Sequence, residues 1–236
     1  MLCTQKKRCL LERKDWRFLS QAGLVSVWRF DGDATDSYGG SPMSLVNSPT
    51  YVAGKFVQAI SLASASSQRC RVDSNPSLQG GVPHVWAVHV YPISTGGREI
   101  VTKYGANASL SDYAFELTAS KFTYTVYRSA SAYTATATTF GTVTANAWYF
   151  ALGGYDGANT FVSVNGGAFD TAAVTGTPNA LTAAVNVGSY NEGAGLFWNG
   201  YVDALYFFKP ERSWLAANLG TLRDYLYQRF LNSSQL

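Results

Sequence analysis

Short stretches in which apolar and polar residues alternate run through most of the chain, which is the pattern of half-buried β-strands. Gly23–Phe30 alternates in this way, and so does Val85–Tyr91, where Trp86, Val88 and Val90 fall on one face. Segments rich in glycine, asparagine, aspartate and serine separate these stretches at short intervals. The pattern predicts many short strands joined by tight turns.

Hairpins are marked clearly in the middle of the chain. Tyr113–Leu117 and Lys121–Tyr127 flank a three-residue turn, and residues 148–174 continue as a meander. Its turns contain Asp156-Gly157 and Asn165-Gly166, residue pairs that adopt the positive φ angles that tight hairpin turns require. We therefore expect consecutive antiparallel strands here.

A helical period appears only near the C-terminus. Pro210 stands where a helix would begin, and Glu211–Asn232 carries apolar residues at spacings of three and four. We interpret this segment as a helix packed over one edge of the strands; a partner-binding helix is the alternative. The apolar stripe consists of Leu215, Leu219, Leu222, Leu226 and Phe230.

The composition agrees with one large all-β domain. Hydrophobic residues make up 47% of the 236 residues and charged residues only 14%, so a sizeable core is available. The predicted fold is a two-sheet jelly-roll sandwich. We place a basic N-terminal arm at residues 1–22, the sandwich at 23–209 and a C-terminal helical segment at 210–236.

Positive charge is concentrated in the first 20 residues. They hold six basic and two acidic residues, a net +4, so the rest of the chain carries −1 of the total +3. The body therefore has no basic surface for nucleic acid, and we expect the arm to dock on a partner protein. The docking candidates are Lys6, Lys7, Arg8, Arg13, Lys14 and Arg17.

Seven phrases, in order from about Gly23 to Phe208, resemble the laminin-G-like family of concanavalin A-like jelly rolls. They are LVSVWRFDGDATDSYGG, GKFVQAISL, VWAVHVYPIS, REIVTKYG, the aromatic strand Trp148–Phe150, YDGANTFVSVNGG and NGYVDALYFF. The resemblance implies a concanavalin A-like sandwich. Because this fold carries lectin-like, adhesive, hydrolytic and virion proteins, the resemblance alone does not identify the function.

Catalysis finds little support in the sequence. Glycosidases of this fold need two carboxylates at a set separation, and alternate residues of one strand would project them into the same cleft. No strand carries such a pair, and the acidic candidates are isolated: Glu99, Glu116, Glu192 and Asp203. We therefore predict a non-enzymatic protein.

A calcium site is one expectation for the loop after the first strand. Asp31, Asp33 and Asp36 lie within six residues, and clustered carboxylates suit Ca²⁺. In related jelly rolls a calcium ion often ties this loop to the last strand, which would recruit Asp203. The alternative is that these aspartates bind nearby backbone amides in Asx-turns.

Glycan binding is a second expectation, because sugars stack on aromatic rings while amide side chains bind their hydroxyl groups. Aromatic and asparagine residues occur at several predicted loops and strand ends. The candidates are Tyr104, Asn107, Tyr155, Asn159, Tyr190, Asn191 and Trp198.

The biological setting is predicted from what accompanies the fold. Residues 1–16 lack the apolar stretch of a secretory signal, three cysteines make no disulfide framework, and no apolar run is long enough for a membrane span. We expect a bacteriophage virion protein, made in the host cytoplasm and displayed at the virion surface in a capsid or tail, touching other virion proteins and copies of itself. The alternative is an extracellular, lectin-like carbohydrate-binding module.

Overall fold

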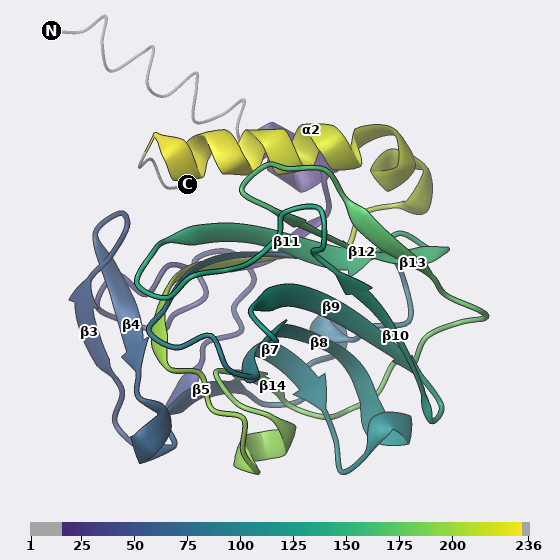
Figure 1. Cartoon of the computed structure of the whole chain (residues 1–236). Helices are drawn as coiled ribbons and strands as arrows, with labels where there is room; N and C mark the ends of the chain where they lie inside the picture. The colour runs from purple at the N-terminus through teal and green to yellow at the C-terminus, as the bar shows by residue number, and fades with distance from the viewer. Residues whose placement is uncertain (1–15, 233–236) are drawn as a thin grey trace, which may run out of the picture.

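The structure, a computed structural model, describes residues 16–232. Its strands form two antiparallel sheets, an eight-stranded sheet A and a seven-stranded sheet B, that pack face to face (Figure 1). A helix near the C-terminus covers sheet A. The prediction of an all-β, two-sheet sandwich with a C-terminal helix is confirmed.

Sheet A contains the two longest strands of the sandwich. Its members are β1 (Leu24–Trp28), β3 (Thr50–Ala53), β4 (Gln58–Leu62), β6 (His84–Pro92), β11 (Tyr149–Tyr155), β12 (Asn159–Val164), β13 (Asp170–Ala173) and β15 (Gly200–Phe208). They lie in the order β13-β12-β11-β6-β15-β4-β3. Where β4 stops pairing with β15, β1 pairs with the rest of that strand.

Sheet B lies on the other side of the core. Its members are β2 (Ser44–Val46), β5 (Arg69–Val72), β7 (Arg98–Tyr104), β8 (Ser111–Thr118), β9 (Lys121–Arg128), β10 (Ser131–Thr136) and β14 (Val185–Val187), in the order β10-β9-β8-β7-β14-β5-β2. The connections contain the short 3-10 helices η1 (Ser64–Ser66), η2 (Pro76–Leu78), η3 (Ala108–Leu110) and η4 (Asn191–Gly193).

Aromatic side chains dominate the core between the sheets. The alternation in β6 directs Trp86 into this core, where its ring centroid lies 4.6 Å from that of Phe207 and 5.9 Å from that of Trp28. The intervening residues of β6 point the other way, toward the helix. The predicted division of this strand into two faces is confirmed.

Helix α2 (Arg212–Leu231) packs on the outer face of sheet A, away from sheet B (Figure 1). Its stripe of Leu215, Leu222, Leu226 and Phe230 is buried there against residues of β1, β6, β11, β12 and β15. The helix therefore covers the face of the sheet and not one edge. This is because the outward residues of these strands are also apolar, so that only a second layer can remove them from water.

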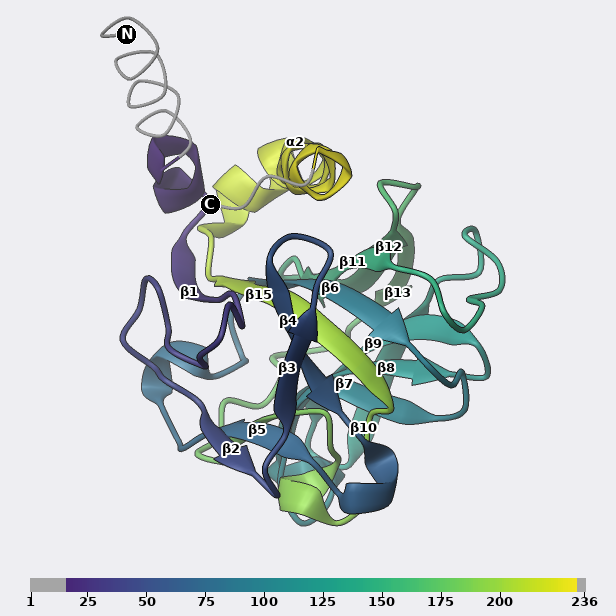
Figure 2. The same ribbon diagram turned by 90° about the vertical axis from the view of Figure 1, so that its left-hand side faces the viewer.

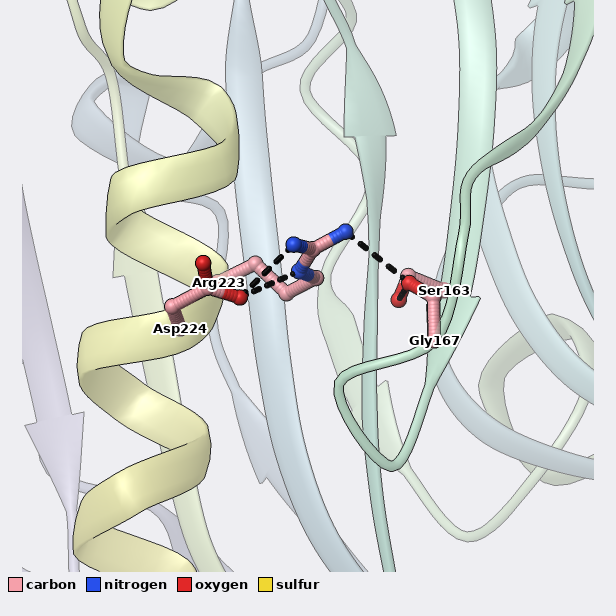
Figure 3. Close-up of polar contacts among 4 residues, drawn as sticks. All are labelled: Ser163, Gly167, Arg223 and Asp224. Atoms are coloured by element: carbon pink, nitrogen blue, oxygen red, sulfur yellow. Dashed lines mark hydrogen bonds and ion pairs between the residues drawn. The ribbon is translucent and has the colours of Figure 1, made fainter.

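Polar contacts fix the position of α2 against the turn between β12 and β13. The Arg223 guanidinium donates to the carbonyl oxygen of Gly167 at 3.0 Å, and Ser163 Oγ donates to the same oxygen at 2.7 Å (Figure 3). Asp224 accepts from Arg223 Nε at 2.8 Å, which orients the guanidinium. Arg223 also lies over the ring of Phe169.

A short helical segment, residues 16–21, lies beside α2 (Figure 2). The ring of Phe18 is 5.0 Å from that of Tyr225 and 5.9 Å from that of Trp214, and Leu19 is fully buried in the same cluster. Part of the predicted arm is therefore packed on the sandwich, because its apolar side chains complete the layer around the helix.

Candidate functional site

Three tyrosines meet on the outer face of sheet B. The Tyr104 ring of β7 lies 4.3 Å from that of Tyr190 and 5.2 Å from that of Tyr127 of β9. Ala114 of β8 packs among them. Tyr104 and Tyr127 are each 8% exposed, whereas Tyr190, in the loop after β14, is half-buried. Burial raises the pKa of Tyr127 and Tyr190, so both hydroxyl groups stay protonated.

A pocket of about 370 Å³ lies next to this tyrosine cluster, since residues that follow Tyr104 and Tyr190 in the chain help to line it. Asn191 is one of the lining residues. Asn107 lies close by in the chain, and its carbonyl oxygen accepts a hydrogen bond from Ser111 Oγ at 2.7 Å and shapes the turn before β8. The lining consists of Gly105, Ala106, Leu110, Leu181, Thr182, Ala183 and Asn191.

The other three predicted ligand residues are not part of this region. Trp198 is fully buried in the core between the sheets, and Tyr155 packs in the same core. Asn159 starts β12, where its side-chain amide donates to Asp156 within their turn at 3.3 Å. Their strand-end positions suggested exposure, but the ends of these strands are covered by neighbouring segments.

A pair of carboxyl groups, which the sequence did not reveal, lies on the same outer face. Glu99 of β7 stands directly opposite Glu116 of β8, and the two side chains share a hydrogen bond. Thr123 Oγ1 donates to Glu116 at 3.2 Å. Burial, the charge of Glu116 and this hydrogen bond raise the pKa of Glu99 well above its usual range.

Strand pairing explains why this carboxyl pair was missed. The two glutamates are 17 positions apart in the chain and belong to different strands. Pairing the predicted strands around 98–104 and 111–118 in register would have placed them opposite each other. Without that register, each glutamate is an isolated charge.

Asn186 of β14 continues the same polar surface. It pairs with Thr102 of β7 on one side and with Arg71 of β5 on the other. Asn186 is fully buried, and neither atom of its amide has a hydrogen-bond partner among the described residues. Ser189 is also fully buried; its carbonyl oxygen accepts from Thr102 Oγ1 at 2.8 Å.

The aspartates of the first loop bind backbone amides. Asp31 accepts from the Gln58 amide at 3.1 Å, and Asp33 accepts from the Thr35 amide at 2.9 Å. Asp36 accepts from four amides, at Val27, Tyr38, Gly39 and Ser41. Burial acts to raise the pKa of Asp36, but these hydrogen bonds outweigh it and lower the pKa. The geometry is that of the Asx-turn alternative.

Asp203 lies at the bulge where β15 changes partner from β4 to β1, and it reaches the same β3–β4 hairpin that Asp31 contacts. Its carboxylate accepts hydrogen bonds from the amides of Lys55 and Phe56, at 2.6 and 3.1 Å, and so holds the turn between β3 and β4. Residues 16–232 contain no group of three or more His, Cys, Asp and Glu side chains placed for a metal ion. Calcium binding stays a prediction without support from this geometry.

Most of the predicted docking arm lies outside the described residues, namely Lys6, Lys7, Arg8, Arg13 and Lys14. Arg17 is described, and it is exposed on the short helical segment beside α2. Among the helices of the described chain, none has the length and apolar character that crossing a membrane requires.

Comparison with protein families identifies the fold's relatives. A laminin-G-type family model, described as the concanavalin A-like lectin/glucanases superfamily, matches residues 63–215. This chain belongs to that superfamily. The match covers the strands from β5 to β15 and the start of α2, and thus both sheets of this concanavalin A-like sandwich. A comparison with curated protein sequences finds no match.

Solved structures with the same fold include binding domains. Domain 4 of AbnA, an extracellular arabinanase from Geobacillus stearothermophilus solved with arabinotriose, has 17% identity and a TM-score of 0.63, over 83% of this chain and 97% of that domain. The binding domain of Paraclostridial Mosquitocidal Protein 1 has 12% identity and a TM-score of 0.70, over 90% and 53%.

Botulinum neurotoxin type C, whose cell entry depends on two ganglioside molecules, matches with 12% identity and a TM-score of 0.67, also over 90% and 53%. The chain therefore spans about half the length of these toxin structures. At such low identities, the similarity establishes the fold.

Proposed function

We propose that this concanavalin A-like sandwich is a non-catalytic carbohydrate-binding module. The observation that carries the proposal is the cluster of Tyr104, Tyr127 and Tyr190 on the outer face of sheet B, beside a pocket of about 370 Å³ that is lined by loops at the ends of β7 and β14. Aromatic rings next to a concave surface, with polar groups nearby, suit the apolar faces and hydroxyl groups of sugars.

The solved relatives support a binding role of this kind. One was determined with arabinotriose, and another enters cells through gangliosides. In both cases the ligand carries sugar units. These are properties of those proteins, and they favour a glycan as the first ligand class to test with this chain.

The geometry of the carboxyl pair favours binding over hydrolysis. Retaining glycosidases hold their two carboxyl groups about 5–5.5 Å apart, and inverting enzymes about 6.5–9.5 Å apart. Glu99 and Glu116 are hydrogen-bonded to each other, so they do not flank a space for a scissile bond as the two carboxyl groups of a glycosidase do.

A glycan array followed by calorimetry tests the proposal. We expect binding to a defined set of oligosaccharides, weakened about tenfold or more by Tyr190→Ala, since losing a stacked ring costs on the order of 1–2 kcal/mol. Tyr201→Ala is the matched control, because Tyr201 is also half-buried and stacks on a tyrosine, Tyr91, but on sheet A. An array without hits would refute glycan binding.

Display on a virion is the second part of the proposal. Residues 16–21 and α2 lie together over sheet A, while the tyrosine cluster lies on the opposite side of the sandwich. An anchor at the N-terminal arm would therefore leave the binding face directed outward, as a capsid or tail protein at the virion surface requires. Deleting residues 1–14 should abolish incorporation into particles while leaving the sandwich folded; unchanged incorporation would refute the anchor.

A further inference from the structure

On the basis of the proposed glycan binding, we infer that Glu99, Glu116 and Asn186 form the hydrogen-bonding floor of that site, beneath the loop 189–196, and that they select a neutral sugar unit with adjacent hydroxyl groups. The carboxyl pair and the amide lie on neighbouring strands of sheet B and on the same outer face. The tyrosine cluster supplies the apolar wall beside them.

Unsatisfied polar atoms carry this inference. Glu99 is 1% exposed and its Oε2 has no hydrogen-bond partner; Asn186 is fully buried with both amide atoms unpartnered among the described residues. A buried polar atom without a partner costs on the order of 1–3 kcal/mol, so such groups are normally satisfied by a bound molecule or water. Two neighbouring strands, β7 and β14, thus carry several unmet donors and acceptors on the same outer face.

The chemistry of these groups matches a hydroxyl-rich, uncharged ligand. Because burial and the neighbouring carboxylate raise the pKa of Glu99, one proton is shared within the pair, and Glu99 Oε2 is left as a hydrogen-bond acceptor. The Asn186 amide offers both a donor and an acceptor. Sugar hydroxyl groups both donate and accept. The remaining negative charge of the pair repels the carboxylate of an acidic sugar next to Glu99, while the positive charge of Arg71 lies two strands away from Glu99, on the far side of Asn186.

The loop 189–196 packs against the strands that carry this floor. Its helix η4 contacts β7 and β14, and the carbonyl oxygen of Leu196 accepts a hydrogen bond from the Glu99 amide at 3.0 Å. Asn191 and Leu196 both adopt positive φ, a strained conformation for non-glycine residues. Since the floor is buried beneath this loop, a ligand reaches it when the loop shifts.

Binding measurements on the full-length chain test the inference, with arabinotriose and lactose as neutral probes and sialyllactose as the acidic probe. We expect Asn186→Ala to weaken binding of a neutral probe about tenfold. This variant should fold normally, because it removes only atoms that have no partner among the described residues. Glu99→Ala should cause a similar loss, while Glu99→Gln, which keeps a donor and an acceptor, should retain wild-type affinity within about threefold.

The outcomes separate this inference from the broader proposal. If Tyr190→Ala abolishes binding but Asn186→Ala and Glu99→Ala do not, the floor holds ordered water only, and the inference fails while glycan binding stands. Tighter binding of sialyllactose than of the neutral probes would overturn the selection of a neutral unit. If neither the probes nor an array yields any binding, glycan binding itself is refuted, and the inference with it.

Discussion

The two outer faces of this sandwich differ in what covers them. The outer face of sheet A is apolar and lies under α2 and residues 16–21. The outer face of sheet B carries tyrosines, threonines, a carboxyl pair and a buried asparagine, and within residues 16–232 short 3-10 helices and loops lie over it. The face of sheet A is therefore sealed by an apolar helical layer, whereas the face of sheet B keeps aromatic and polar groups under a thinner cover.

Lowering the pH should change the stability contributions of these two faces in opposite directions. Sheet A holds His89, whose pKa is lowered to about 3 by burial, so the folded state resists protonation there. Sheet B holds Glu99, whose pKa is raised, so the folded state retains a proton there. The predictions below test this contrast, beginning with the largest expected effect.

Replacing a buried residue of α2 should show how much the covered face of sheet A contributes to stability. Leu222→Asp removes a fully buried side chain and places a carboxylate in the apolar layer, so we expect a loss of about 5 kcal/mol in the free energy of unfolding. Thr221→Asp, exposed on the same helix, should change it by less than about 0.5 kcal/mol. Urea unfolding measures both; similar losses would show that α2 does not stabilise sheet A.

His89 should make the covered face sensitive to acid. Its ring lies among Phe150, Phe230 and Tyr206, and neither ring nitrogen has a partner among the described residues. Because its folded pKa, about 3, lies below the ordinary value of 6.5, its contribution to stability is present above about pH 6.5 and is lost as the pH falls toward 3.

The matching experiment compares wild type with His89→Leu in urea at several pH values. When the pH is lowered from 7 to 4.5, we expect the free energy of unfolding of wild type to fall by about 3 kcal/mol more than that of the variant. His84, whose pKa is lowered to about 4 by burial, is present in both proteins and does not enter the difference. Parallel pH profiles would contradict the assigned environment of His89.

Glu99 should produce the opposite dependence of stability on pH. The effect should be smaller than that of His89, because Glu116 shares the proton of Glu99. Since the folded pKa of Glu99 is raised, its contribution is present at low pH and is lost as the pH rises through that folded pKa. We therefore expect the Glu99→Gln variant to be more stable than wild type at pH 8. At pH 5 the two proteins should have similar stability. A difference that does not change with pH would argue against a shared proton.

Metal removal should have the smallest effect. The carboxylates of Asp31, Asp33 and Asp36 are bonded to backbone amides, so we expect a chelator to change the Tm by less than about 1 °C. Calcium bound at 100 times its Kd would stabilise the fold by about 2.7 kcal/mol, which corresponds to a Tm shift of 5 °C or more. A shift of that size, abolished by Asp33→Asn, would establish the calcium site.

Two of the three tyrosines in the cluster, Tyr104 and Tyr190, were among the residues predicted from the sequence to bind a ligand, whereas the carboxyl pair was not predicted. Tyr104 and Tyr190 were identified because they stand at strand ends or in loops, which is a local property. Tyr127 also stands at a strand end, but the predicted strand Lys121–Tyr127 does not show whether its last residue faces the core or the outside, because that depends on the opposing sheet. Trp198 was misplaced for the same reason, since its segment is covered from both sides.

The sequence by itself determined the strands, the hairpin turns and the C-terminal helix, because alternation, Asp-Gly and Asn-Gly turns and the leucine stripe act over a few neighbouring residues. Only the tertiary structure decided the partners of distant groups. Asp203 meets the amides of Lys55 and Phe56 from almost 150 positions away, and Glu99 meets Glu116 through strand register. Such pairings depend on how whole strands align, and no short stretch of sequence contains that information.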